Sequence, residues 1–325
     1  MNDTPALPPL HGWLVLDKPP GLGSTDAVSA VKRALRRGGY ARTKVGHGGT
    51  LDTLAHGVLP IALGEATKLA GRMLDASKEY SFTVAFGAEI DTLDLDGQVI
   101  ATADHRPTLA DIEAALPAFR GPIAQLPPTY SALKIAGRRA SDRARAGEEV
   151  ALQPRAVTIF ALEHAQPDPP PALAGGVGGG SSFLSECRLH ARVSKGTYIR
   201  ALARDLSRAL GTVGHVTDLQ RTAAGPFRLG DALSLDRMGE LALGGTLQRA
   251  VLPLGAALDD IPALPLTPEQ ADVLRKGQRL SGVARTPGLQ LATLADKPVA
   301  LVEFDGLEVR VVRGFNLPDV EDEDR

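Results

Sequence analysis

Two segments far apart in the chain alternate apolar and polar side chains with a period of two. Residues 80–86 and 187–193 both follow this pattern, which is typical of strands with one buried and one polar face. Other segments have the apolar spacing of a helix. Val28, Val31 and Leu35 would form one apolar stripe, and another helix is expected after Gly196. Helices that interleave with half-buried strands favour an α+β fold, with a mixed or antiparallel sheet flanked by helices.

Local signals predict the first elements of this fold. Residues 13–16 should form a buried strand, followed by a turn at residues 17–21. The next helix should be capped by Ser24 or Thr25 and should end at Gly38.

Length and composition limit the class of protein. The chain has 325 residues, 43% of them hydrophobic, which suits one large domain and a small one. Its single cysteine, Cys187, excludes a disulfide scaffold. No apolar stretch approaches the roughly 18 residues of a membrane-spanning helix, and the first residues lack the features of a signal peptide. We therefore expect a soluble, cytosolic protein without a membrane partner.

Composition shifts along the chain predict its domains. Residues 166–182 contain eleven Gly, Pro or Ser among seventeen, and strand patterns flank them, so we expect a flexible loop within one domain. Residues 252–265 are rich in proline, and beyond them Asp305-Gly306 between two alternating runs predicts a hairpin with a type I′ turn. The predicted units are a catalytic domain (1–255), a small all-β module (256–317) and an acidic tail (318–325).

The net charge of −2 counts against a nucleic-acid partner at first sight. However, the tail holds five acids and one base, and the rest of the chain has 35 basic and 33 acidic residues. The basic residues gather at 32–44, at 134–145, and at Arg200, Arg204 and Arg208, which share one helix stripe. Each cluster alone is most simply a solvated face, whereas three together suggest a phosphate-binding surface.

The segment 44–64 is the densest in glycine, with four glycines between residues 46 and 57. We expect a functional loop that leads into a short helix, with His47 and Asp52 as its most reactive side chains. From this pattern alone, Asp52 is equally well explained as the cap of a helix that begins near Leu54. P-loop, dinucleotide and HExxH motifs are absent, and no two histidines have metal-ligand spacing, so we expect chemistry without metal or cofactor.

Four segments together resemble the bacterial tRNA pseudouridine synthase B (TruB) family. The segment KVGHGGTLDTLAHGVLPIALGEATK is similar to the family's catalytic motif, GHTGTLDPLATGVLP. The other three are LVLDKPPGLGSTDAVSAVKR, PPTYSALKIAGRRASDRARAGEEV and VSKGTYIRALARDLSRALG, in the family's order. The resemblance covers most of residues 12–235, and it departs from the family at Gly48, Thr53 and His56. In its position in the chain and its general sequence pattern, the C-terminal module resembles the family's PUA domain.

The resemblance implies a function and a set of site residues. It implies an isomerase that converts uridine 55 in the tRNA T loop to pseudouridine, a monomer whose partner is the T-arm stem-loop. Asp52 would start the break of the glycosidic bond, by attacking the nucleoside or by taking a sugar proton. Arg200 would pair with Asp52, and Tyr198 would accept the C5 proton. The implied substrate-binding residues are His47, which assists flipping, Tyr80, which stacks on uracil, Gly49, Lys18 and Tyr130.

The RNA backbone would meet the basic clusters. The expected contacts are Lys32, Arg33, Arg36, Arg37, Arg42, Lys44, Arg138, Arg139, Arg143, Arg204 and Arg208. Two other functions stay open from the residues: a non-catalytic RNA-binding or RNA-folding protein, and a carboxylate hydrolase with a second acid beside Asp52.

Overall fold

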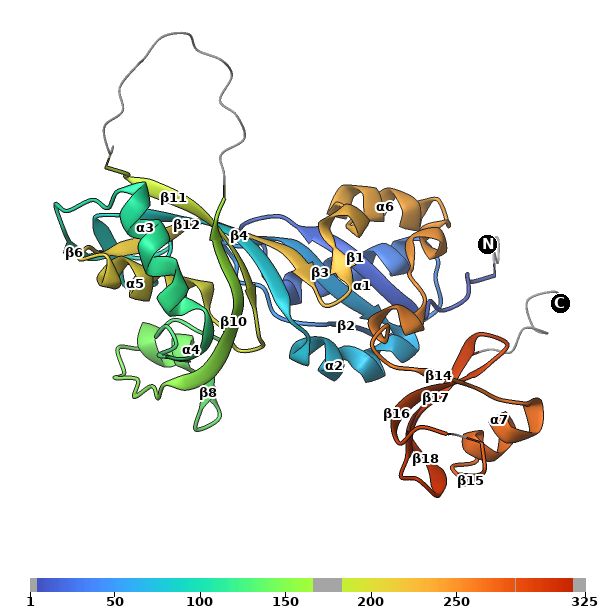
Figure 1. The fold of residues 1–325 in the computed structure, drawn as a ribbon. Helices are drawn as coiled ribbons and strands as arrows, with labels where there is room; N and C mark the ends of the chain where they lie inside the picture. Colours follow the sequence, from blue (N-terminus) through green and yellow to red (C-terminus); the bar gives the residue numbers. More distant parts are fainter. Residues whose placement is uncertain (1–4, 166–182, 284, 318–325) are drawn as a thin grey trace, which may run out of the picture.

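The computed structural model describes residues 5–165, 183–283 and 285–317 (Figure 1). The predicted 166–182 loop and the acidic tail 318–325 lie outside the described residues. Within the described ranges, no helix is both long and apolar enough to cross a membrane.

A large sheet forms the centre of the first domain. Its strands follow the order β1 (Gly12–Lys18), β3 (His56–Leu63), β12 (Gly214–Ala224), β4 (Lys78–Phe86), β11 (Glu186–Val193), β10 (Arg155–His164) and β7 (Gly121–Gln125). In addition, β2 (Val45–His47) pairs with β3, and β13 (Phe227–Arg228) pairs with β12. Only β12 and β3 are parallel among these pairs, so the predicted mixed, largely antiparallel sheet is confirmed.

The alternating segments are the neighbouring strands β4 and β11. Along β11 every second residue is buried, and Phe82, Val84 and Phe86 are buried on β4. These side chains share one core with α5 (Ile199–Ala209), which contributes Leu202 and Leu206. The helix expected after Gly196 is therefore confirmed, and α3 (Leu109–Ala115) covers the same half of the sheet (Figure 1).

Strand β1 is buried on both faces, which explains its uninterrupted apolar run. Leu14 and Leu16 pack in the core that α1 (Ser24–Arg37) and α6 (Leu235–Leu243) cover. On the opposite face, Trp13 packs against Phe227, with ring centroids 5.4 Å apart, in the core beside α2 (Ala70–Asp75).

Two local predictions in this domain are wrong. Helix α1 ends at Gly38 as expected, but its N-cap is Gly23, because the Ser24 hydroxyl is bonded to the backbone of Leu51 instead. The segment 44–64 is not one loop, because residues 56–63 form the buried strand β3 between β1 and β12. No helix begins near Leu54, and Asp52 therefore caps none.

The C-terminal module has its own sheet. Its strand order is β14 (Ala263–Pro265), β16 (Gly288–Leu294), β17 (Lys297–Phe304), β18 (Glu308–Gly314) and β15 (Leu280–Ser281). The prediction of an all-β module is wrong, because Thr267 and Gln270 form a capping box that starts α7 (Pro268–Arg275). Core residues Leu291, Leu301 and Phe315 pack together with Trp13, which joins the module to the first domain.

The predicted hairpin of β17 and β18 is confirmed, but its turn is not type I′. That turn needs positive φ at two successive residues, and here Gly306 has a φ of 103° while Asp305 does not lie in that region. The Asp305 carboxylate instead accepts the amides of Leu307 and Glu308. Positive φ at two successive residues occurs between β16 and β17, at Ala295 and Asp296.

Short elements complete the chain. These are β5 (Ala88–Ile90), β6 (Val99–Thr102), β8 (Lys134–Ile135), β9 (Arg138–Arg139), α4 (Ala140–Arg145) and the 3₁₀ helices Gly64–Leu69, Leu116–Phe119, Leu229–Asp231, Leu247–Ala250 and Leu254–Ala257.

Candidate active site

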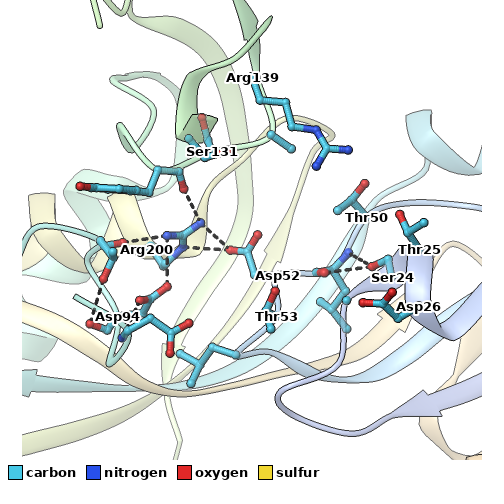
Figure 2. A pocket seen from close by; sticks show the side chains of 18 of the residues that line it. Ser24, Thr25, Asp26, Thr50, Asp52, Thr53, Asp94, Ser131, Arg139 and Arg200 are labelled. Atoms are coloured by element: carbon cyan, nitrogen blue, oxygen red, sulfur yellow. Dashed lines mark hydrogen bonds and ion pairs between the residues drawn. The ribbon is translucent and has the colours of Figure 1, made fainter. Parts of the chain in front are cut away.

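The loop of residues 48–55, which we call the catalytic loop, joins β2 to β3 and carries Asp52. Arg200, in the first turn of α5, reaches this carboxylate with two nitrogen atoms. Its Nε donates to Oδ2 of Asp52 at 2.9 Å, and its Nη2 lies 2.8 Å from the same oxygen (Figure 2). The expected Arg200–Asp52 pair is therefore confirmed. The arginine is buried, whereas the Asp52 side chain is 37% exposed and open to a ligand.

The remaining contacts of Arg200 fix its guanidinium. Nη1 donates to the carbonyl of Thr92 at 2.7 Å and lies 3.1 Å from the carboxylate of Asp94. Nη2 also donates to the carbonyl of Tyr130 at 3.0 Å. Buried Asp94 comes from the turn between β5 and β6, and no local pattern in the sequence marks it as a partner of Arg200.

A cavity of about 370 Å³ lies against Asp52 (Figure 2). Most of its lining comes from four segments: the start of α1, the catalytic loop, the turn between β5 and β6, and residues 130–145. His47 of β2 and Arg200 of α5 complete it. The volume is within the range of pockets that hold small ligands, and most of the lining groups are polar.

The expected substrate-binding residues divide into two groups. His47, half-buried, and Tyr130 line the cavity. Burial, and secondarily the charge of Arg221, lower the pKa of His47, whereas burial and the nearby Asp91 carboxylate raise the pKa of Tyr130. Tyr80 and Tyr198 are half-buried and do not belong to the described lining. Tyr80 packs against the β4–β11 core, and the backbone of Tyr198 is bonded to the Gln125 side chain.

Lys18 does not face the cavity, so its predicted substrate contact is contradicted. The side chain is fully buried behind the catalytic loop, where Nζ donates to the carbonyls of Pro19, Leu22 and Thr53. Burial is the main reason that its pKa falls to about 8. Gly49 is also buried, with a φ of 143° that a side chain would strain.

The first basic cluster lies on the surface. All of its members are exposed and have no ion-pair partner within the described residues: Lys32, Arg33, Arg36, Arg37, Arg42 and Lys44. Four of them, Lys32, Arg36, Arg42 and Lys44, line a groove of about 940 Å³ beside α1. Strand β2 leads from this groove to His47 at the cavity, so the two sites are neighbours.

The second cluster stands on the other side of the cavity. Arg138 and Arg143 both pair with Glu148, at 2.7 Å and 2.8 Å. Arg139 and Arg145 line the cavity and have no ion-pair partner within the described ranges. Figure 2 shows Arg139 extending toward Thr50.

The third cluster is not a free surface. Arg204 is buried, bonded to the carbonyl of Leu126 and to Asp205, so its predicted contact with RNA is contradicted. Arg208 is exposed but pairs with buried Glu89 at 2.7 Å. The helix stripe that carries these arginines faces other segments of the same domain, and the stripe pattern alone could not show this.

The three departures from the family motif are accommodated locally. A Cβ on Gly48 would lie 2.8 Å from Cβ of Met73, so the loop packs tightly there. The Thr53 carbonyl accepts the Gly21 amide, and His56 Nε2 lies 3.0 Å from Asp218. None of these contacts disturbs the pair of Asp52 and Arg200.

Comparisons with known proteins agree with this fold and site. The chain is 57% identical to the tRNA pseudouridine synthase B of Novosphingobium aromaticivorans, over 96% of this chain and 99% of the relative. It is 53% identical to the protein of that name from Zymomonas mobilis, over 94% and 96%. A solved H/ACA ribonucleoprotein, bound to a substrate RNA containing 2′-deoxyuridine, has a TM-score of 0.68 at 23% identity, over 95% of this chain and 86% of that one. The last likeness shows a shared fold.

Fold, site and relatives together define a pseudouridine synthase, which is an isomerase. Residues 36–199 match the N-terminal domain of the TruB family pseudouridylate synthases, and residues 200–259 match the C-terminal domain of tRNA pseudouridylate synthase B. The chain belongs to the TruB family.

Proposed function

We propose that this chain converts uridine 55 in the T loop of tRNA to pseudouridine. The observation that carries the proposal is one partly exposed carboxylate, Asp52, held by the buried guanidinium of Arg200 at the wall of a cavity. The substrate class is supported by the relatives, which are named tRNA pseudouridine synthase B.

The reaction conserves every atom of the nucleoside. The bond between C1′ and N1 breaks, the uracil rotates, and a bond between C1′ and C5 forms; the C5 proton leaves and N1 gains one. Asp52 starts the reaction by attacking the nucleoside or by removing a sugar proton, and Arg200 keeps the carboxylate aimed at the cavity. Tyr198 accepts the C5 proton.

The target base must leave its stack to reach Asp52. Burial lowers the pKa of His47 and so favours its uncharged ring, which suits insertion into the space that the base vacates. Tyr80 stacks on the flipped uracil, and Gly49 and Tyr130 border it. Because Tyr80 and Tyr198 do not line the cavity without RNA, both roles require the site to open further when substrate binds.

The exposed basic residues hold the RNA backbone around this site. The groove beside α1 and the arginines at 138–145 stand on two sides of the cavity, and a PUA-like module at residues 256–317 adds a third contact. We propose that the protein acts on the T-arm as a monomer in the cytoplasm, without metal or cofactor.

Release of tritium from tRNA that carries [5-³H]uridine tests the function. We expect release from unmodified tRNA and none from the same tRNA with cytidine at position 55. No release from folded enzyme would overturn the assignment, and equal release from both tRNAs would overturn the choice of position 55.

Replacing the carboxylate tests the role of Asp52. We expect Asp52→Asn to abolish tritium release while the Kd for tRNA stays within about threefold, because the backbone contacts lie elsewhere. Asp236→Asn, at an exposed position of α6, is the matched control and should keep full activity. Turnover by Asp52→Asn would remove the carboxylate from the first step.

A further inference from the structure

Arg221 on β12 is a buried cation that the proposed mechanism does not use. It is 1% exposed, and its guanidinium donates to three carbonyl oxygens: Val58 at 2.7 Å, Thr50 at 3.1 Å and Gly49 at 3.2 Å. No carboxylate pairs with it within the described residues. A buried charge without a counter-ion is costly, so this arrangement needs a reason beyond packing.

Two of the three carbonyls belong to the catalytic loop, and other buried groups hold the next ones. The Ser24 hydroxyl donates to the carbonyl of Leu51 at 2.9 Å, and Lys18 donates to the carbonyl of Thr53 at 3.3 Å. The carbonyls of Gly49, Thr50 and Thr53 are therefore directed at the buried cations Arg221 and Lys18 behind the loop, whereas Ser24 lies at the cavity and binds both the carbonyl and the amide of Leu51.

This anchoring determines which backbone groups face the cavity. In a trans peptide the C=O and the following N–H point in opposite directions. The N–H groups of Thr50 and Leu51 consequently point away from Arg221, and that of Leu54 points away from Lys18. The Leu51 N–H donates to the Ser24 hydroxyl at the cavity, and those of Thr50 and Leu54 donate to no residue in the described ranges. Thr50 and Leu54 both line the cavity, so the loop offers it a free donor on each side of Asp52 in the sequence.

We propose that Arg221 is a positioning residue for the reaction: by holding the carbonyls of Gly49 and Thr50, it aims Asp52 and turns the loop's N–H groups toward the RNA. This inference rests on the proposed function. Phosphate and uracil oxygens are acceptors, so carbonyls turned into the cavity would repel the substrate, whereas N–H groups bind it. Misplacing Asp52 by about 1 Å costs on the order of a hundredfold in rate.

Lys78 provides a matched comparison for a purely structural role. It is also buried and donates to three carbonyls, those of Met73, Leu74 and Ala76. These carbonyls lie in and just after α2, not in the catalytic loop. Lys78→Met therefore removes a similar buried cation, which lies beside Arg221 and Gly49, without breaking a hydrogen bond to the catalytic loop.

The test compares Arg221→Lys, Arg221→Ala and Lys78→Met under single-turnover conditions, with the Kd for tRNA and the melting temperature measured for each. We expect both Arg221 variants to lose roughly a hundredfold in rate while Kd changes less than about fivefold. Millimolar guanidinium should restore part of the rate of Arg221→Ala. Lys78→Met should lower the melting temperature and keep its rate.

Three results would overturn the inference: an unchanged rate in Arg221→Lys, no rescue by guanidinium, or an equal loss in Lys78→Met. If wild type itself releases no tritium, the proposed function fails, and hydrogen exchange over residues 46–56 then decides the role of Arg221. Faster exchange there in Arg221→Lys but not in Lys78→Met supports the anchoring of the loop. Equal exchange in the two variants refutes it.

Discussion

Gly57 lies where the anchors of the catalytic loop converge. It pairs with Lys18 on one side of β3 and with Arg221 on the other, and its φ is 95°. A Cβ at this position would lie 2.4 Å from the carbonyl oxygen of Arg221 and 3.2 Å from its carbonyl carbon and amide nitrogen. These are backbone atoms of a central strand, and they cannot move aside as a flexible side chain could.

The magnitude for Gly57→Ala follows from this geometry. A non-glycine residue in this region of φ costs about 1–3 kcal/mol, and an extra methyl forced into a packed site costs about the same again. We expect a loss of roughly 2–6 kcal/mol, a large part of the 5–15 kcal/mol that stabilises a typical domain. The corresponding fall in melting temperature is on the order of 10 °C.

Urea and thermal unfolding followed by circular dichroism measure this effect. Gly239→Ala is the matched control, because a Cβ there has no neighbour within 4 Å and the position is inside α6. That control should be more stable than wild type by about 0.5–1 kcal/mol. If Gly57→Ala unfolds within about 0.5 kcal/mol of wild type, the close approach of β3 and β12 is not the constraint that we infer.

Two further predictions concern charge. The double variant Lys32→Gln/Arg36→Gln should reduce the slope of log affinity for tRNA against log salt concentration by about 1.5–2. The control Arg237→Gln should leave this slope unchanged. If the double variant and wild type have equal slopes, the groove does not contact RNA. Burial lowers the pKa of Lys18 and of Lys78 from 10.5 to about 8. Between these two pH values the unfolded chain therefore binds more protons than the folded chain, and the free energy of unfolding should rise with pH. Urea midpoints across this range should show a smaller rise in Lys18→Met; an equal rise would contradict the assignment.

Part of this fold could be predicted from local patterns, because those patterns report burial. Alternation identified β4 and β11, and helical spacing identified α1 and α5. Strand β3 was missed because Gly57 and Pro60 read as loop residues. Its strand conformation depends on pairing with β1 and β12, which lie far from it in the sequence.

The candidate site, like the fold, could be predicted from the sequence only in part. Asp52 and Arg200 came from a motif resemblance, and their contact is present in the structure. Arg221 and Lys18 carry no local signal, because a buried cation that binds carbonyls looks in sequence like any surface cation. The hydrogen bond from Arg221 to Thr50 joins residues that are 171 positions apart in the sequence. Asp94 likewise pairs with Arg200 from a distant segment, the turn between β5 and β6.

The fold also changes the interpretation of the three clusters of basic residues. Of the three basic clusters, the one on α5 is used inside the domain, where Arg200 and Arg204 are buried. The other two flank the cavity, one along the groove beside α1 and the other with Arg139 and Arg145 at its rim. RNA held by both sides must therefore pass over Asp52. Since neither side touches the Asp52 carboxylate, removing charge from one side should weaken binding and leave the rate of the bound complex unchanged.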